Sequence, residues 1–447
     1  MIRSRLLCLA LSLWLVFTAA LPVEAADGGI RLIRDAEVEH IIRTFATPIF
    51  DAAGLDPSAI SVYLIEDNRL NAFVAGGMNL FLNTGTLMRS EGPLQIMGVI
   101  AHETGHIAGG HLARAQEALH SASIQAIIET VLGAIGAALS RGGSGGPGGG
   151  SSVAQRSFLQ YSRSQEAAAD QAGMSYLERA GYSARGLLEF FEILNGEAVL
   201  LEGNQDPYLL THPLTEDRIE AVRFFISKAR HSDTPPPPDF VQLHARMRAK
   251  LIGFLQPLAQ VLRLYPETNQ NLDARYARAI AYYRASDLNK ALPILDKLLA
   301  DYPSDPYFHE LKGQIMFENG RLAEAVQGYQ KAVDLDPTEP LLRLGLAQAQ
   351  LETEKNELVR PALAHLEDVV RHEPKNGFAW HLLAIAYGRT DQLGMAALAL
   401  SEAALARADR KEAAAQAERA MRALPENSPA WLRAQDIRRA AGKQENS

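Results

Sequence analysis

The chain has 447 residues, of which 47% are hydrophobic and 21% are charged, a composition that is ordinary for a soluble globular protein. It is too long for one ordinary hydrophobic core, so two domains are expected. The formal net charge is −8. This balance gives no indication of a nucleic-acid surface, which requires lysines and arginines clustered on one face.

The N-terminal segment has the features of a signal peptide. Two arginines precede an apolar run at residues 6–20, and small residues surround a predicted cleavage site after Ala25. We expect residues 1–25 to be removed on export; the alternative, a retained membrane anchor, requires an apolar run of about 20 residues. The only cysteine, Cys8, lies early in the run, which disfavours a lipid anchor. The mature chain then has no cysteine, and any metal site must use histidines and carboxylates.

A domain of helices with a few strands is expected next, at residues 26–232. Residues 31–50 have helical periodicity, and residues 60–65 and 72–82 are rich in strand-forming residues. Gly76 and Gly77 favour a tight turn or a bulge inside the second stretch. A helix is then expected to start at Pro93 and to continue to His111.

An unusually apolar segment, residues 124–139, follows and leads into the Gly-rich stretch 142–152, which predicts a flexible loop. The segment is expected to be buried in the first domain or docked as a lid, because it lacks the basic face of a membrane-surface helix. Contact with a membrane or a partner stays an alternative. The helical pattern resumes at residues 158–228.

Four consecutive prolines, Pro235–Pro238, then predict an extended linker at residues 233–240. Beyond it, residues 241–447 are helical and repetitive, with prolines recurring after 37, 34 and 37 residues at Pro266, Pro303, Pro337 and Pro374. The small residues at matching offsets resemble the tetratricopeptide repeat, whose paired helices touch at such positions. The last interval, 51 residues to Pro425, predicts one helix pair plus an extra helix. A plain helical bundle is the alternative.

The segment with the strongest functional signal is the HExxH motif at residues 102–106. Residues four apart on a helix are rotated by about 40° and separated by about 6 Å along the axis, so His102 and His106 project from one face. Two neutral imidazoles at this spacing can bind one Zn²⁺, and Glu103 beside them can accept a proton from water. The alternative is an exposed histidine pair on a surface helix.

A catalytic zinc needs a third protein ligand and an open position. Glu166 is the best candidate, because it shares a helix face with Asp170 among alanines that would allow close packing against the HExxH helix. Asp170 would hydrogen-bond a ligand histidine and fix its tautomer. A solvated acidic helix face is the alternative for these two carboxylates.

Together, these motifs resemble the zinc metallopeptidases related to CAAX prenyl endopeptidases. Among them, the chain is similar to the periplasmic branch with a tetratricopeptide domain, the beta-barrel assembly-enhancing proteases. The match extends to Asn71–Val74, to Thr211–Thr215 and to Arg218. The resemblance implies a mainly α fold: a zincin-type metalloprotease domain with a small β-sheet, followed by an α-solenoid of tetratricopeptide repeats.

The resemblance also implies a role for His212, on a loop that occupies or guards the open zinc position as a regulatory fourth ligand. A capping or structural histidine before Pro213 is the alternative. Arg218 is expected to orient the site carboxylates or to stabilise the transition-state oxyanion. His111, five residues past His106, is expected to face elsewhere on the helix and to be structural.

One Zn²⁺ per chain, held by His102, His106 and Glu166, would lower the pKa of its water to about 7. Glu103 and Asp170 are the predicted catalytic residues, with Glu103 as the general base. The extended segment Asn71–Val74 is expected either to pair with a substrate strand or to form an internal hairpin.

The resemblance implies a periplasmic endopeptidase that degrades misassembled outer-membrane beta-barrel proteins and assists their assembly. The implied partners, reached through the repeats, are those proteins and the machinery that inserts them. The main alternative is a chaperone or adaptor of outer-membrane assembly whose protease site is largely latent. A general degradative endopeptidase is a third hypothesis.

Overall fold

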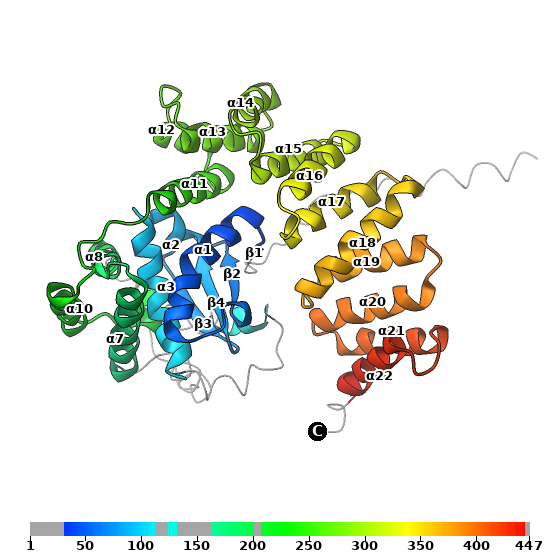
Figure 1. Ribbon diagram of the computed structural model, residues 1–447, viewed down its shortest axis with the longest axis horizontal. Helices are drawn as coiled ribbons and strands as arrows, with labels where there is room; N and C mark the ends of the chain where they lie inside the picture. The colour runs from blue at the N-terminus through cyan, green and yellow to red at the C-terminus, as the bar shows by residue number, and fades with distance from the viewer. Residues whose placement is uncertain (1–30, 112–123, 125, 132–162, 201–206, 443–447) are drawn as a thin grey trace, which may run out of the picture.

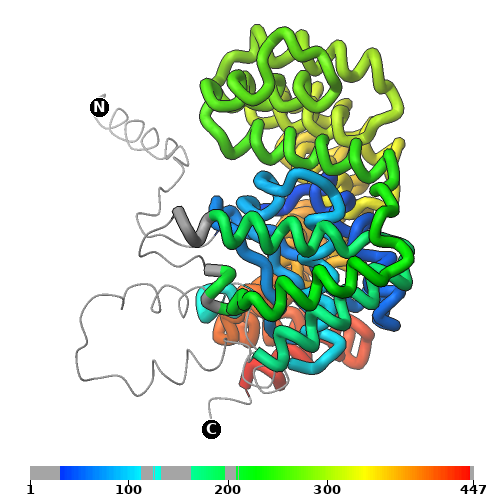
Figure 2. Tube along the Cα trace, turned by 90° about the vertical axis from the view of Figure 1, so that its left-hand side faces the viewer, coloured from blue at the N-terminus to red at the C-terminus, as the bar shows by residue number. Residues whose placement is uncertain are grey.

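The computed structural model describes residues 31–111, 124, 126–131, 163–200 and 207–442. The predicted signal peptide and the Gly-rich stretch 142–152 lie outside the described residues. A sheet with its covering helices forms one part of the molecule, and an arc of paired helices curves around it from α11 to α22 (Figure 1). Turned by 90°, the last helices of the arc lie behind the sheet-containing part (Figure 2).

The sheet has four strands in the order β1-β2-β4-β3. The central strands β2 (Ser61–Ile65) and β4 (Asn79–Asn83) are parallel, and β3 (Ala72–Ala75) pairs antiparallel with β4. Gly76 and Gly77 connect β3 to β4 with φ of +58° and +103°. A left-handed backbone favours glycine, so the predicted turn is confirmed.

The first strand, β1 (Leu32–Ile33), was expected to be part of the first helix, and this prediction is wrong. Leu32 and Ile33 pair antiparallel with β2 instead. Helix α1 (Ala36–Ala53) begins later because the Asp35 carboxylate accepts a hydrogen bond of 2.9 Å from the Val38 amide. Such a cap satisfies an amide that has no partner inside the helix.

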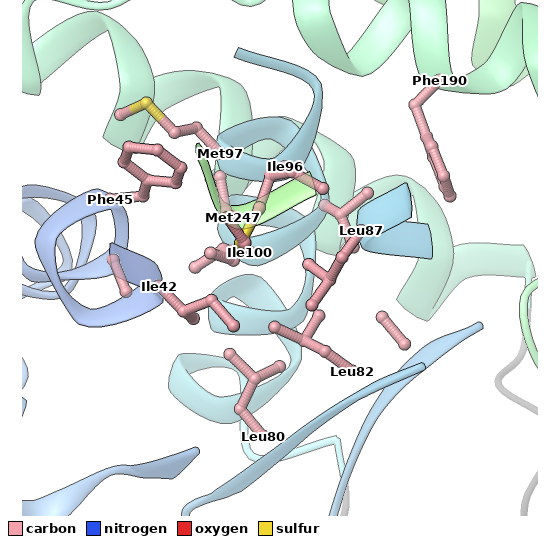
Figure 3. Close-up of a cluster of buried hydrophobic side chains, with 14 of the residues drawn as sticks. Ile42, Phe45, Leu80, Leu82, Leu87, Ile96, Met97, Ile100, Phe190 and Met247 are labelled. Atoms are coloured by element: carbon pink, nitrogen blue, oxygen red, sulfur yellow. The ribbon is translucent and has the colours of Figure 1, made fainter. Parts of the chain in front are cut away.

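The two faces of the sheet are both covered. On one face, β4 meets α1 and α3 (Pro93–Ala108), where side chains labelled in Figure 3 converge: Ile42, Phe45, Leu80, Leu82, Ile96 and Ile100. On the other face, Ile127, Ile128 and Val131 of the apolar segment are buried against Phe73 and Phe81. The described part of that segment is therefore helical and docked on the sheet.

Helix α7 (Arg163–Ala180) crosses α3 at very short range. A Cβ atom on Gly105 would lie 2.6 Å from the carbonyl oxygen of Ala169, and one on Gly173 would lie 2.9 Å from that of Ala101. The two backbones can approach this closely because both contact positions lack a side chain. The remaining helices of this part are α2 (Thr84–Arg89), α8 (Arg185–Leu200), α9 (Pro207–Thr211), α10 (Glu216–Lys228) and the 3-10 turn Pro57–Ala59.

The predicted linker is only partly extended. Pro238 is the first residue of α11 (Pro238–Leu255), a position where proline's missing amide costs nothing. Phe240 packs on Phe45 of α1, with ring centroids 5.0 Å apart, and Met247 also lies in the core of the first part. Helix α11, predicted to open the repeat domain, therefore belongs structurally to both parts.

Regular helix pairs follow, and their bounds agree with the predicted repeats. They are α12 (Leu258–Leu264), α13 (Leu272–Arg284), α14 (Leu288–Asp301), α15 (Pro306–Glu318), α16 (Leu322–Leu335), α17 (Pro340–Glu352), α18 (Asn356–His372), α19 (Gly377–Arg389), α20 (Leu393–Ala406), α21 (Arg410–Ala423) and α22 (Pro429–Gly442). The long last interval holds α19, α20 and α21, which confirms one pair plus an extra helix.

A buried ionic cluster joins the two parts at the start of α1. Glu37, only 1% exposed, accepts a hydrogen bond of 2.7 Å from the Tyr276 hydroxyl and contacts Arg246 and Lys250 of α11. Arg246 also donates to Asp305 at 2.7 Å. Removing one partner of a buried ion pair leaves an uncompensated charge, so this cluster holds the repeats in one orientation.

Within the part of the chain that the structure describes, every helix is too short or too polar to cross a bilayer.

The close contact between α3 and α7 predicts that Gly173→Ala will lower the free energy of unfolding by about 1–3 kcal/mol, the usual cost of overpacking. Denaturant titration measures this change. The matched control is Gly196→Ala on α8, where a Cβ atom meets nothing within 4 Å, and we expect it to stabilise by up to about 1 kcal/mol. Equal effects of the two substitutions would contradict the packing argument.

Candidate metal centre

The HExxH motif lies on the buried second half of α3. The apolar residues Ile96, Val99 and Ile100 fix this helix in the core, and His102, Glu103 and His106 are all 0% exposed. The Nε2 atoms of His102 and His106 lie 3.1 Å apart. The exposed-pair alternative is thereby excluded, because both imidazoles point into the protein.

Glu166 on α7 faces both imidazoles. Its Oε1 lies 3.3 Å from Nε2 of His106, and its Oε2 lies 3.5 Å from Nε2 of His102. Glu166 is itself 0% exposed. The alternative of a solvated acidic face does not hold for this residue.

His212 comes from the loop after α9 and completes the group. Its Nδ1 lies 3.1 Å from Oε1 of Glu166 and 3.2 Å from Nε2 of His102, and its Nε2 lies 3.5 Å from Oε1 of Glu103. One ligand atom from each of His102, His106, Glu166 and His212 falls within 4.8 Å of the others. These four residues form a compact buried donor set.

Asp170 and Arg218 lie directly behind this set. Asp170 Oδ1 is 2.8 Å from Nδ1 of His102, and Arg218 on α10 donates to both Asp170 oxygens at 2.6 and 2.8 Å. The same guanidinium lies 2.8 Å from Glu166 and 4.9 Å from the ring centroid of Phe191. Of the two roles considered for Arg218, this geometry fits the orientation of the carboxylates, because its donors are directed at them.

His111 does not face elsewhere, and that prediction is wrong. Helix α3 ends at Ala108, and Gly110, with φ of +61°, turns the chain back. Nδ1 of His111 then lies 3.0 Å from Nδ1 of His106. The prediction failed because it extended the helix to residue 111; the paired glycines before His111 were the available signal for a helix end.

Tyr208 was also missed. Its buried ring stacks on the imidazole of His212, with centroids 4.6 Å apart and an angle of 24° between the planes. Phe190 also packs edge-to-face with Tyr208, with ring centroids 5.4 Å apart and an angle of 89° between the planes. A tyrosine four residues before a histidine on a short helix carries no distinctive sequence signal.

Burial and mutual proximity shift the pKa values of the site. Burial raises the pKa of Glu103 above its usual range, and burial lowers the pKa of His106 well below its usual value. Burial alone would raise the pKa of Glu166, but the facing histidines His212, His106 and His102 hold it far below the usual value. These shifts favour the neutral form of His106 and the ionised form of Glu166, the states in which both bind metals.

The donor set fits a metal ion. Both carboxylate oxygens of Glu103 are buried and have no hydrogen-bond partner among the described residues, and an orphaned buried carboxylate is costly. The Nε2 atoms of His102 and His106 face each other at a distance where one proton or one cation must satisfy both lone pairs. Two imidazoles and a carboxylate form a catalytic zinc set when one position stays open.

Comparisons with known proteins agree with this geometry. Residues 33–225 match peptidase family M48, and residues 276–340 match a tetratricopeptide repeat. The chain is 26% identical over 367 residues to the beta-barrel assembly-enhancing protease of Yersinia pestis, covering 79% of this chain and 73% of that protein.

Two further relatives come from Escherichia coli (strain K12). The beta-barrel assembly-enhancing protease is 27% identical over 339 residues, covering 74% of this chain and 68% of that protein. The metalloprotease LoiP is 26% identical over 189 residues, covering 42% of this chain and 71% of that protein. The resemblance to the beta-barrel assembly-enhancing proteases is confirmed, and residues 33–225, which match peptidase family M48, are a metallopeptidase domain.

Proposed function

We propose that the chain is a zinc-dependent endopeptidase in which His102, His106 and Glu166 hold one Zn²⁺. The observation that carries this proposal is the convergence of two imidazole nitrogens and one carboxylate beside the buried carboxylate of Glu103, whose oxygens have no hydrogen-bond partner among the described residues. We assign the protease domain to residues 26–232, the linker to 233–240 and the repeat domain to 241–447, with α11 packed against both the protease domain and the repeats.

Zinc, when bound, acidifies a coordinated water and polarises the substrate carbonyl. The residues of the chain then handle the proton. Glu103 accepts it from the attacking water and delivers it to the leaving amine, and the pKa of Glu103, raised by burial, makes it a stronger base than an exposed glutamate. Asp170 accepts a hydrogen bond from the Nδ1–H of His102, and this tautomer leaves the lone pair on Nε2 available for the metal.

His212 is proposed as a regulatory fourth ligand that keeps the enzyme latent. Its proximity to Glu166, His102 and Glu103 at once supports this role, since one ring contacts two proposed ligands and the proposed base. With His212 as a fourth ligand, the proposed zinc would have no coordination position left for water. Movement of the loop after α9 would release the site.

Strand β3 is the proposed substrate-binding edge. It lies at one end of the sheet and, among the described residues, pairs only with β4, and it also contacts α3. Both expectations for Asn71–Val74 are therefore compatible, because one edge of β3 forms the hairpin. A substrate strand on the other edge would be recognised mainly through its backbone.

The physiological role is proposed from the names of the relatives. We infer that the chain acts in the periplasm after removal of residues 1–25 and degrades misassembled outer-membrane beta-barrel proteins while assisting their assembly. The repeats would bind these proteins or their assembly machinery, since helical repeats offer extended protein-binding surfaces. The second candidate, a chaperone or adaptor with a latent site, is favoured by the contact of His212 with the proposed base.

The first test is zinc content and casein cleavage of the purified protein with and without Glu103→Gln. We expect the variant to keep about one zinc per chain and to lose at least about 100-fold in cleavage rate, because it lacks the general base. Exposed Glu220→Gln is the matched control and should be unaffected. Cleavage that survives in the Glu103 variant would refute the proposed role. Retained support of outer-membrane assembly in the variant would separate the chaperone role from proteolysis.

The latch predicts that His212→Ala will cleave casein faster than the unmodified protein. If the latch is engaged in about nine of ten molecules, the gain is about tenfold. His40→Ala, at an exposed position on α1, is the control. An unchanged rate in a His212 variant that retains its zinc would show that this histidine does not block the site.

Asp170→Asn is expected to weaken zinc binding about 10–100-fold, because the metal-ligating His102 loses its anionic partner. Competition with a chromogenic chelator measures this affinity. Arg218→Lys keeps the charge but not the two-pronged hydrogen bond to Asp170, so we expect a smaller loss. Zinc affinity equal to that of the unmodified protein in both variants would argue against a supporting role for this pair.

A further inference from the structure

We propose that His111 is a positioning residue that holds the His106 imidazole in the tautomer and orientation required for metal binding. This inference deepens the proposed function and rests on the proposed metal site. Asp170 supports the first ligand histidine, His102. In the same way, His111 would support the second, His106, but without a charge.

The contact between the two rings is specific. Nδ1 of His111 lies 3.0 Å from Nδ1 of His106, within hydrogen-bond distance. The rings meet edge to face, with centroids 5.0 Å apart and an angle of 75° between their planes. The His106 nitrogen in this contact is the one that does not face Glu166 and His102.

The tautomers follow from the geometry. Nε2 of His106 faces the donor set, so it must carry a lone pair there to bind a metal. The proton of the neutral His106 ring is then on Nδ1, and this N–H donates a hydrogen bond to Nδ1 of His111. His111 must accept at Nδ1 and therefore carries its own proton on Nε2. The competing His106 tautomer carries its proton on Nε2 and cannot bind the metal. Removing the His111 acceptor would make that tautomer less unfavourable.

The backbone at the end of α3 is arranged to bring His111 to this position. Gly110 turns the chain with φ of +61°, and the amide of His111 donates to the carbonyl of His106 at 3.2 Å. Gly109 has an ordinary helical φ of −73°, so its own conformation does not require glycine. A Cβ atom there would, however, lie 2.6 Å from Nε2 of the His111 ring. The small residue at 109 is thus explained by the space that the His111 ring occupies.

The two ligand histidines consequently have unequal partners. His102 donates to the carboxylate of Asp170, which is itself held by Arg218, whereas His106 donates to a neutral imidazole. A carboxylate strengthens a histidine ligand more than a neutral acceptor does, since hydrogen bonds to ionised groups are about twice as strong. His111 therefore acts mainly through orientation and choice of tautomer.

The test compares three variants of the full-length mature protein by zinc affinity, measured by competition with a chelator. His111→Phe keeps a ring but has no acceptor, and we expect about 10–100-fold weaker zinc binding. His111→Asn places an amide oxygen near the original Nδ1 position and should restore at least most of the affinity. Gly109→Ala displaces the ring without removing it and should weaken binding as well. His372→Phe, at a side chain that is 55% exposed, is the control.

A second readout reports the tautomer directly. Nitrogen-15 chemical shifts of the zinc-loaded protein should show His106 protonated at Nδ1, with a proton coupled to His111. Zinc affinity in His111→Phe equal to that of the unmodified protein, or equal losses in the Phe and Asn variants, would overturn the inference. Absence of zinc binding by the unmodified protein would instead reject the proposed function, so the two failures are distinguishable.

Discussion

The close crossing of α3 and α7 is the contact on which the rest of the site depends. Gly105 lies against the backbone of Ala169, and Gly173 lies against that of Ala101. A Cβ atom at either position would lie within 2.9 Å of the facing backbone, so the helices would have to move apart. At the observed separation, Glu166 faces the two motif histidines and Asp170, one turn later, faces the back of His102.

This arrangement concentrates polar groups inside an apolar core. His102, His106, Glu166 and His212 are all 0% exposed, and burying such groups is costly unless each is satisfied. Arg218 forms ion pairs with Asp170 behind the donor set and with Glu166 inside it, and His111 and Tyr208 pack against the imidazoles. Both carboxylate oxygens of Glu103 lack a hydrogen-bond partner among the described residues, as expected for a group that acts on a substrate or on water.

The repeats are attached firmly to the protease part. Helix α1 packs under the sheet with its middle residues, while its first turn joins the ionic cluster of α11 and the repeats through Glu37. Arg34, just before α1, also reaches Glu373 of the arc at 2.6 Å. The arc therefore curves around the protease part in a defined orientation (Figures 1 and 2). A protein bound by the repeats would be held at a fixed position relative to the metal centre.

Local patterns in the sequence determined much of this protein. Periodicity located α3 and α7, the glycine pair located the β3–β4 turn, the proline spacing located the helix pairs, and the HExxH motif identified the metallopeptidase domain. These features depend on neighbouring residues, which a sequence displays directly. Tertiary structure alone decided the rest: the end of α3 that brings His111 onto His106, the stacking of Tyr208 on His212, the pairing of β1 with β2, and the sharing of α11 by both parts. Each of these depends on residues brought together from separate elements or on a helix end set by competing contacts, and no local periodicity encodes such contacts.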